Sequence, residues 1–489
     1  MKRIYLSLIF VWCFYSSYAQ GSFTDSLKLA IGTWGTVASK DYQPLWSVSN
    51  RFGAIRDQKS DLSTFISISN KHLLNDNNQY PGFSEDSPWS ISYGADVYNN
   101  KHFGTVFFQQ AYIKLNYGAW QLRGGRYKEI VGEMDADLST GSLGISGNAL
   151  PIPKVGIALT QYSRVPFTNG WLQVKGLFSH GWMGNNRYMK DAYLHEKTLY
   201  LRIGKNKLKL YGGIQHYAEW GGRRDDWTSL DRSVKGFMNV VLLKEADDGS
   251  VDYGDSVKTH RPNRAGDHRG VIEAGLEYDF ERVKLNVYNQ TPFDTGQGID
   301  IRNIDRLFGI SLTNKEDSFW RKFLAEFIYT RQMNDFYSAQ YRESYYNNGV
   351  YKTGWEYEDR IIGTPLFINR QRGSKYFSEI APYDWDAEQN TIPGNSNIIN
   401  NQVIGGHIAA LYTIDRRFGA RSMITYTRNY GGNKVLKPHK DQCYTLQEVN
   451  YKLPSDNVLL TAGFAYDFGD LSKNFGMILG VKWQLAGVL

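Results

Sequence analysis

Apolar and polar positions alternate along many short stretches of this chain, and the last of them, residues 475–485, shows the pattern most plainly. From Met477 to Leu485 every second residue is apolar, and the residues between them include Lys482 and Gln484. This period of two predicts a β-strand with one apolar and one mixed face. Such a strand at the end of a chain is typical of a membrane β-barrel, where it pairs with the first strand and leaves no open edge.

Further segments of strand length carry the same alternation or a strand-like composition. Some are separated by very short turns, at Gly118, Lys205-Asn206 and Glu281-Arg282, and others by long polar connections. This asymmetry is typical of short periplasmic turns and long extracellular loops, and it predicts an all-β fold, a transmembrane antiparallel barrel of about 16–18 strands. The segments are 62–70, 89–98, 105–117, 119–127, 155–162, 170–179, 198–204, 207–216, 270–280, 283–290, 320–332, 403–414, 419–429, 443–452 and 458–467.

Three stretches do not fit the strand pattern. Residues 233–246 form too long an apolar run for an alternating strand and predict a helix. Its stripe is Val234, Phe237, Met238, Val241 and Leu242. The helix could plug or cap the barrel, or pack on its surface. Residues 247–269 and 334–401 are polar and long, and they predict loops.

The N-terminus predicts export. Lys2 and Arg3 precede an apolar run over residues 4–14, and a small-residue pattern ends at Ala19. This is the composition of a secretory signal peptide, which we expect to be residues 1–19, so that residues 20–489 form the barrel domain. No later segment predicts a transmembrane helix. Of the two cysteines only Cys443 lies outside the signal, so we expect no internal disulfide.

Composition agrees with a membrane barrel. Aromatic residues make up 15% of the chain, while the mean hydropathy is only −0.47. A membrane barrel with two aromatic girdles and a polar lumen combines a high aromatic content with a low mean hydropathy. A secreted β-rich enzyme or propeller could have the same composition. No internal repeat of about 20–50 residues supports a propeller. The net charge of +7 comes without a long basic run, so nucleic acid is not an expected partner.

Two aromatic and charged segments are candidates for glycan binding. The first holds Trp220, Arg223, Arg224, Asp225 and Trp227 around a Gly-Gly pair. Indole faces stack on sugar rings and Arg grips carboxylates in a bidentate manner, so this segment could bind an acidic glycan. The alternative is a girdle Trp beside a salt-bridged loop.

The second segment lies in the long connection over residues 334–401. Its Trp355 and Tyr357 stand among acidic residues and Arg360. It carries the same chemistry as the first segment and leaves the same two alternatives open.

No other pattern predicts catalysis, a metal or a cofactor. Glu133, Asp135 and Asp137 lack the spacing of a calcium loop and predict a polar turn or a lumen-facing network. His195 has no second histidine at zinc-motif spacing. No Gly-x-Ser-x-Gly elbow is present, and Ser179-His180 and Ser422 are only isolated candidates for a barrel phospholipase.

Several stretches in order along the mature chain carry a family resemblance: residues 44–53, 132–143, 148–153, 180–181, 194–197, 216, 220–222, 348–357 and 362–366. Together they resemble the Wzi family of outer-membrane capsule-assembly proteins. The resemblance implies a large monomeric barrel of 18 strands, closed on its periplasmic side by helices, for which residues 233–246 are the candidate. It also implies a lectin-like role in holding or organising exported polysaccharide. The C-terminus departs from the usual final aromatic residue of outer-membrane barrels.

We therefore expect an outer-membrane barrel, not an enzyme, that binds or organises capsular polysaccharide or exopolysaccharide at the cell surface. Its expected partners are that polysaccharide, outer-membrane lipids and the barrel-assembly machinery. The alternative function is a porin or channel for saccharides or other small solutes. A blocked lumen favours the first function and an open polar lumen the second.

Overall fold

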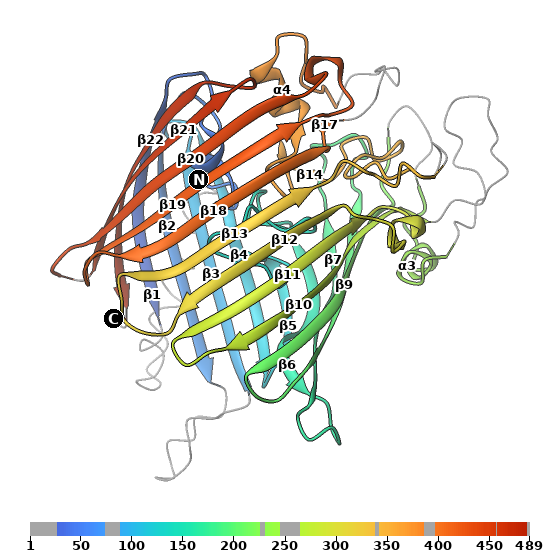
Figure 1. Ribbon diagram of the computed structural model, residues 1–489, viewed down its shortest axis with the longest axis horizontal. Coiled ribbons are helices and arrows are strands. Elements are labelled where there is room, and N and C mark those ends of the chain that lie inside the picture. The colour runs from blue at the N-terminus through green and yellow to red at the C-terminus, as the bar shows by residue number, and fades with distance from the viewer. Residues whose placement is uncertain are drawn as a thin grey trace, which may run out of the picture.

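An 18-stranded antiparallel sheet closes on itself to form a barrel (Figure 1). The structure is a computed structural model that describes residues 27–73, 89–224, 230–244, 265–337, 342–385, 397–455 and 457–486. The predicted signal peptide lies outside these residues. The barrel strands are β1 (Lys28–Ala38), β2 (Ser60–Leu73), β3 (Trp89–Asn100), β4 (Thr105–Tyr117), β5 (Trp120–Arg126), β6 (Lys154–Arg164), β7 (Leu172–Trp182), β8 (Tyr193–Ile203), β9 (Leu208–Trp220), β10 (Asp267–Asp279), β11 (Val283–Phe293), β12 (Arg306–Asn314), β13 (Trp320–Tyr329), β18 (Val403–Thr413), β19 (Phe418–Asn429), β20 (Lys440–Lys452), β21 (Val458–Gly469) and β22 (Asn474–Ala486).

The terminal strand closes the barrel, as its alternation predicts. β22 pairs with the whole length of β1, from Lys28 opposite Ala486 to Ala38 opposite Gly476. Leu479 is 57% exposed on the outer wall, whereas its neighbour Ile478 is 1% exposed on the lumen side. Period two therefore separates a lipid-facing row from a lumen-facing row, and closure leaves no unpaired edge at the seam.

The two ends of the barrel differ in their connections. The end at which β1 begins and β22 ends has short turns between consecutive strands, including 118–119, 204–207, 280–282 and 414–417, and we call it the short-turn end. Gly118 allows the tightest of them, because its φ of +54° lies in the left-handed region. The other end has the long connections 39–59, 127–153, 221–266 and 330–402, and we call it the long-connection end.

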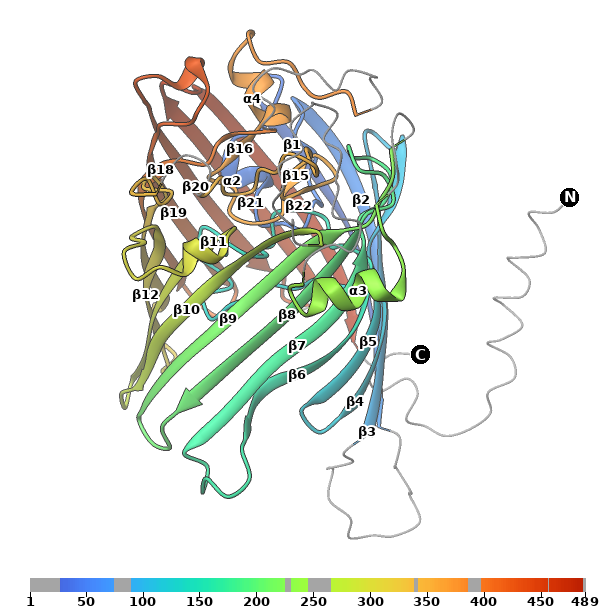
Figure 2. The ribbon, with the colours of Figure 1, turned by 90° about the vertical axis from the view of Figure 1, so that its right-hand side faces the viewer.

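Three of these long connections fold into the lumen and form a plug. They are 39–59 with α2 (Leu45–Val48), 127–153, and 330–402 with α4 (Arg370–Tyr376) and the short strands β14 (Glu356–Tyr357), β15 (Arg360–Ile361), β16 (Ile368–Asn369) and β17 (Ile398–Asn400). Figure 2 shows α2, α4, β15 and β16 within the outline of the barrel at this end. Buried side chains from all three connections and from the wall share one hydrophobic core, which includes Trp46, Leu138 and Trp355.

Polar side chains of the wall hold the plug through its backbone. Glu326 of β13 accepts hydrogen bonds from the Thr140 amide at 2.7 Å and the Ser139 hydroxyl at 2.6 Å. Four strands further round the wall, Asp467 of β21 accepts one from the Leu45 amide at 2.8 Å. Because buried amides without partners are costly, these contacts fix where the plug sits.

The predicted polar network around Asp135 is part of this plug. Asp135 accepts hydrogen bonds from the Leu138 amide and the Ser311 hydroxyl. Lys322 of β13 forms ion pairs with both Asp135 and Asp137, at 3.1 and 2.6 Å. A lysine ammonium therefore stands between the two carboxylates that the sequence brings together.

The helix predicted over residues 233–246 forms, but the expectation that it closes the lumen is wrong. It is shorter, α3 (Val234–Val241), and packs on the outside of the wall (Figure 2). Its predicted stripe is divided: Phe237 lies against the wall, whereas Val234 is 81% exposed. The helices described within the lumen, α2 and α4, lie at the long-connection end. No helix in the described ranges is long and apolar enough to cross a membrane.

Exposed aromatic side chains mark both ends of the outer wall. At the short-turn end these include Trp89, Tyr117, Trp120, Trp171, Phe280 and Trp320. Towards the long-connection end they include Phe103, Trp182, Phe468 and Phe475. These two belts correspond to the girdles that Trp and Tyr form at membrane interfaces, with the apolar wall between them.

Candidate functional site

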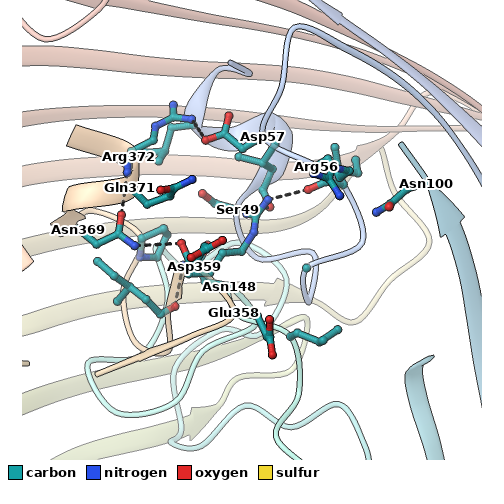
Figure 3. Close-up of a pocket in the computed structure, with 18 of the residues that line it drawn as sticks. Ser49, Arg56, Asp57, Asn100, Asn148, Glu358, Asp359, Asn369, Gln371 and Arg372 are labelled. Carbon is teal, nitrogen blue, oxygen red and sulfur yellow. Dashed lines mark hydrogen bonds and ion pairs between the residues drawn. The ribbon is translucent and has the colours of Figure 1, made fainter. Parts of the chain in front are cut away.

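A cavity of about 510 Å³ opens in the plug at the long-connection end, and we call it the plug pocket (Figure 3). Its lining comes from the 39–59 connection, the facing ends of β3 and β4, Arg126 at the end of β5, and plug residues 148–150 and 358–375. Segments about 300 residues apart in the sequence thus share one cavity, because three connections fold into the same lumen. A cleft of this size lies in the usual range for small-ligand and saccharide sites.

One side of the pocket is a network of satisfied charges. Arg372 donates to Asp57 at 2.6 Å and to the Gln43 carbonyl at 2.9 Å, and Lys375 lies 3.1 Å from the same carboxylate. Burial would raise the pKa of Asp57, but Arg372 and Lys375 outweigh it and hold the pKa well below its usual range. Two cations thus share one carboxylate, and these paired groups form the floor of the pocket.

A second set of polar groups has fewer protein partners. Within the described ranges, the Arg56 guanidinium and the Gln371 amide make no hydrogen bond or ion pair. The Asn100 Oδ1 atom is buried and also lacks a partner there. Figure 3 shows Arg56 and Asn100 across the cavity from Gln371. Groups of this kind are available to hydrogen-bond a ligand.

Two exposed carboxylates complete the lining. Glu358 and Asp359 follow β14 and have positive φ angles of 50° and 65°, so the chain turns sharply there. Groups of opposite charge therefore line the same pocket, since Arg56 and Arg126 belong to it together with these two acids. Amide, guanidinium and carboxylate groups together can hydrogen-bond many hydroxyls, whereas no metal-binding cluster occurs in the described part of the chain.

The barrel wall is shortened beside the pocket. β5 ends at Arg126, opposite Ala111 of β4, so residues 105–110 of β4 extend beyond their pairing with β5. The chain then turns inward as the 127–153 connection and returns to the wall only at Lys154. The pocket residues Thr105 and Phe107 lie on this part of β4.

A family model described as capsule assembly protein Wzi matches residues 50–372, which include all of the pocket lining except Leu45, Val48, Ser49 and Lys375. The chain belongs to the Wzi family. Among solved structures, this Wzi-family chain is similar to Escherichia coli Wzi, an outer-membrane protein involved in group 1 capsule assembly and a carbohydrate-binding β-barrel. The two share 12% identity with a TM-score of 0.56, over 94% of this chain and 84% of that one.

Other outer-membrane barrels are similar at a lower level. Pseudomonas aeruginosa OpdL has 10% identity and a TM-score of 0.47, over 94% of this chain and 98% of its own. The trimer form of Vibrio cholerae OmpT has 8% identity and a TM-score of 0.38, over 94% and 98%. No curated protein matches this chain. The closed barrel and the family place this Wzi-family protein in the outer membrane.

The glycan-binding residues predicted from sequence are dispersed by the fold. Trp355 is fully buried, and its indole nitrogen donates to the Gly144 carbonyl at 2.7 Å. Tyr357 is 5% exposed and accepts a hydrogen bond from Arg126 at 3.1 Å. Trp220 is 3% exposed and is covered by Phe237 of α3. In this conformation none of the three rings offers a free face to a sugar.

The remaining predicted residues lie nearer the surface. Arg223 pairs with Asp191 at 2.8 Å, and Arg224 donates to the Tyr188 and Trp385 carbonyls at 3.2 Å. Both arginines therefore already have protein partners. Asp225 and Trp227 lie outside the described residues. Ser179 and His180, the candidates for a phospholipase site, point to opposite sides of the wall. The Ser179 hydroxyl donates a hydrogen bond to Glu196 in the lumen, whereas the His180 ring contacts Phe237 outside the barrel.

Sequence reasoning missed Arg56, Asn100 and Gln371. None of them belongs to a motif, and only the folding of the plug brings them together. The one available signal was the length of the 334–401 connection, which indicated a functional loop.

Proposed function

We propose that this protein binds capsular polysaccharide or exopolysaccharide at the cell surface and acts by holding it rather than by catalysis. The long connections then face outward, as in other outer-membrane barrels. Family membership supports the polysaccharide, since E. coli Wzi is a carbohydrate-binding barrel of capsule assembly. The observation that carries the proposal is a polar pocket in a lumen that the plug fills.

The plug pocket is the proposed saccharide site. Arg56, Gln371 and Asn100 supply hydrogen bonds for hydroxyl or carboxylate groups, and Phe107 gives a short apolar wall. The satisfied floor of Asp57, Arg372 and Lys375 keeps the cavity open in the absence of ligand, which lowers the cost of binding. The filled lumen argues against the porin alternative, because solute would have to displace the plug core.

The test replaces groups that do not hold the fold. Arg56→Ala with Gln371→Ala should weaken binding of the polysaccharide purified from the native cell surface by about tenfold, the expected loss of one or two hydrogen bonds to charged or polar groups. Binding is measured on the purified barrel by affinity electrophoresis, and retained surface polysaccharide is measured on cells. Arg417→Ala, on a turn at the opposite end, is the matched control. Unchanged binding would remove the plug pocket as the site.

A second contact surface is proposed at residues 220–227, of which the described residues 220–224 lie at the rim of the long-connection end. Arg223→Ala with Arg224→Ala, measured in the same assay, should lower retention of acidic polysaccharide while leaving the barrel assembled. If Arg223→Ala with Arg224→Ala loses polysaccharide binding while Arg56→Ala with Gln371→Ala keeps full binding, the binding site lies at the rim and not in the plug pocket.

A further inference from the structure

The inner face of α3 is fixed to the outside of the barrel wall. Phe237 contacts Phe178, His195 and Trp220, with ring centroids 6.3, 5.7 and 5.6 Å apart. Val240 is buried with Ala218 and Trp220. At the C-terminal end, the Lys197 ammonium of β8 donates to the Val241 carbonyl, which is otherwise an unsatisfied group of the last turn. The helix is therefore docked rather than loosely attached.

The opposite face of α3 is apolar and exposed. Val234, Met238 and Leu242 are 81%, 45% and 53% exposed. They lie four residues apart, so they form one stripe along the helix. Arg232 and Lys244 stand exposed at the two ends of the stripe. An apolar stripe facing water would be costly on a protein surface, so its position on the barrel matters.

That position is the aromatic belt nearest the long-connection end. α3 covers Trp220 of β9. Across neighbouring strands, Trp220 lies opposite Tyr193 of β8, and Tyr193 lies opposite Trp182 of β7. Further along the same outer face, Leu199 and Ile214 are paired and are 51% and 41% exposed. The stripe of α3 therefore continues the lipid-facing surface of the wall at its upper boundary.

We propose that α3 is an interfacial anchor whose stripe of Val234, Met238 and Leu242 lies in the outer leaflet of the membrane. Its axis runs along the wall surface, Arg232 and Lys244 reach the phosphate level, and the apolar side chains enter the acyl region, as amphipathic interfacial helices do. The partner is the lipid surface itself. This anchor does not depend on the proposed polysaccharide function. It fixes residues 230–244 at the membrane plane.

A fluorophore on the stripe tests this contact. Met238→Cys in a Cys443→Ser background is labelled with an environment-sensitive dye, and the barrel is folded into phosphatidylcholine vesicles with or without brominated acyl chains. Lys205→Cys, in the exposed β8–β9 turn, is the water-facing control, and Leu201→Cys, on the lipid-facing wall, is the membrane control. We expect a blue-shifted emission at position 238 and a loss of about half of it in brominated vesicles.

Two results would overturn the anchor. Emission at position 238 that matches Lys205→Cys would mean that the stripe faces water. If neither brominated lipid nor aqueous iodide quenches the dye at position 238, and Met238→Cys cross-links between chains, a second copy of the chain covers the stripe. Heat-modifiable mobility on gels confirms that each variant is a folded barrel, so a failure to fold cannot be mistaken for either result.

Discussion

At the scale of single residues, the plug holds a carboxyl group whose charge is set by burial. Glu356 of β14 is 3% exposed and accepts hydrogen bonds from the Asn369 and Asn397 side-chain amides, both at 2.6 Å. Burial raises its pKa to about 7, against 4.5 for an exposed glutamate, although both amides oppose the shift. The folded plug therefore binds a proton here more tightly than the unfolded chain does.

This shift predicts that the plug loosens as the pH rises. Between about pH 4.5 and 7 the folded state holds more protons than the unfolded state, so the free energy of opening falls by about 3 kcal/mol and then levels off. Glu356→Gln keeps an acceptor for both amides but cannot ionise, so it should remove the part of this pH dependence that Glu356 contributes. Amide hydrogen exchange of residues 342–385 at pH 5 and pH 8 measures the pH dependence of opening. The exposed neighbour Glu358→Gln is the control, and an undiminished pH dependence in Glu356→Gln would contradict the assignment.

Single residues were the hardest level to predict from sequence. Trp355 between acidic neighbours has the same local sequence whether its ring binds a sugar or, as here, lies in the core of a plug. Arg56 and Gln371 carry no local signal, because their shared cavity depends on connections that meet only in three dimensions. The network around Asp135 was predictable, since its carboxylates are adjacent in the chain.

At the scale of elements, the lumen face of the wall is built from aromatic residues that lie over glycines of the next strand. Tyr200, Tyr211 and Tyr288 each stand directly opposite a glycine on the lumen side. Trp34 of β1 and Gly480 of β22 make the same pair at the closing seam. A Cβ on any of these glycines would collide with the facing ring. The rings cover exposed backbone, a known way to stabilise glycines in sheets.

Gly309→Ala tests this arrangement. The new methyl group would collide with the Tyr288 ring, which cannot move freely because its hydroxyl donates to Glu326 at 2.7 Å. We expect a loss of about 1–3 kcal/mol in unfolding free energy, measured by denaturant titration in lipid or detergent. Gly419→Ala is the control, since its Cβ would meet open space, and it should be neutral or slightly stabilising. Equal stability of the two variants would show that the ring contact contributes nothing.

Elements were largely predictable, and the exceptions have a common cause. Alternation located the terminal strand and the hairpins at Gly118 and Lys205-Asn206, but it missed β1 and β12. In β12, Leu307 is buried against the plug while Phe308 is exposed outside, so both faces are apolar and the alternation disappears. α3 was predicted as a helix, but its apolar residues were assigned to a single stripe. In the structure they form two sides, of which one packs against the wall and the other is exposed.

At the scale of the whole molecule, the lumen is filled from the end with long connections. Resemblance to the family indicated closure by helices on the periplasmic side. The described chain instead closes the other end with three connections that share a core with the wall. The sequence could not predict this plug, because hydrogen bonds to carboxylates and amides of the wall hold it. Such segments show no helical or strand-like periodicity along the chain. The shortened β5 beside the plug pocket follows from the same arrangement, since the chain leaves the wall there to enter the lumen.

The plug predicts that the intact barrel carries no large steady current in a planar bilayer. Glu326→Ala should change this, because it leaves the buried Thr140 amide and Ser139 hydroxyl without their acceptor, at a cost of about 1–3 kcal/mol for each group. The 127–153 connection would then open part of the time, and brief conducting events should become at least several times more frequent. Glu316→Ala, which removes an exposed carboxylate from a turn at the other end, should leave the recordings unchanged. A stable open current through the unaltered protein would mean that solute passes the plug, and it would restore the channel function that the filled lumen argues against.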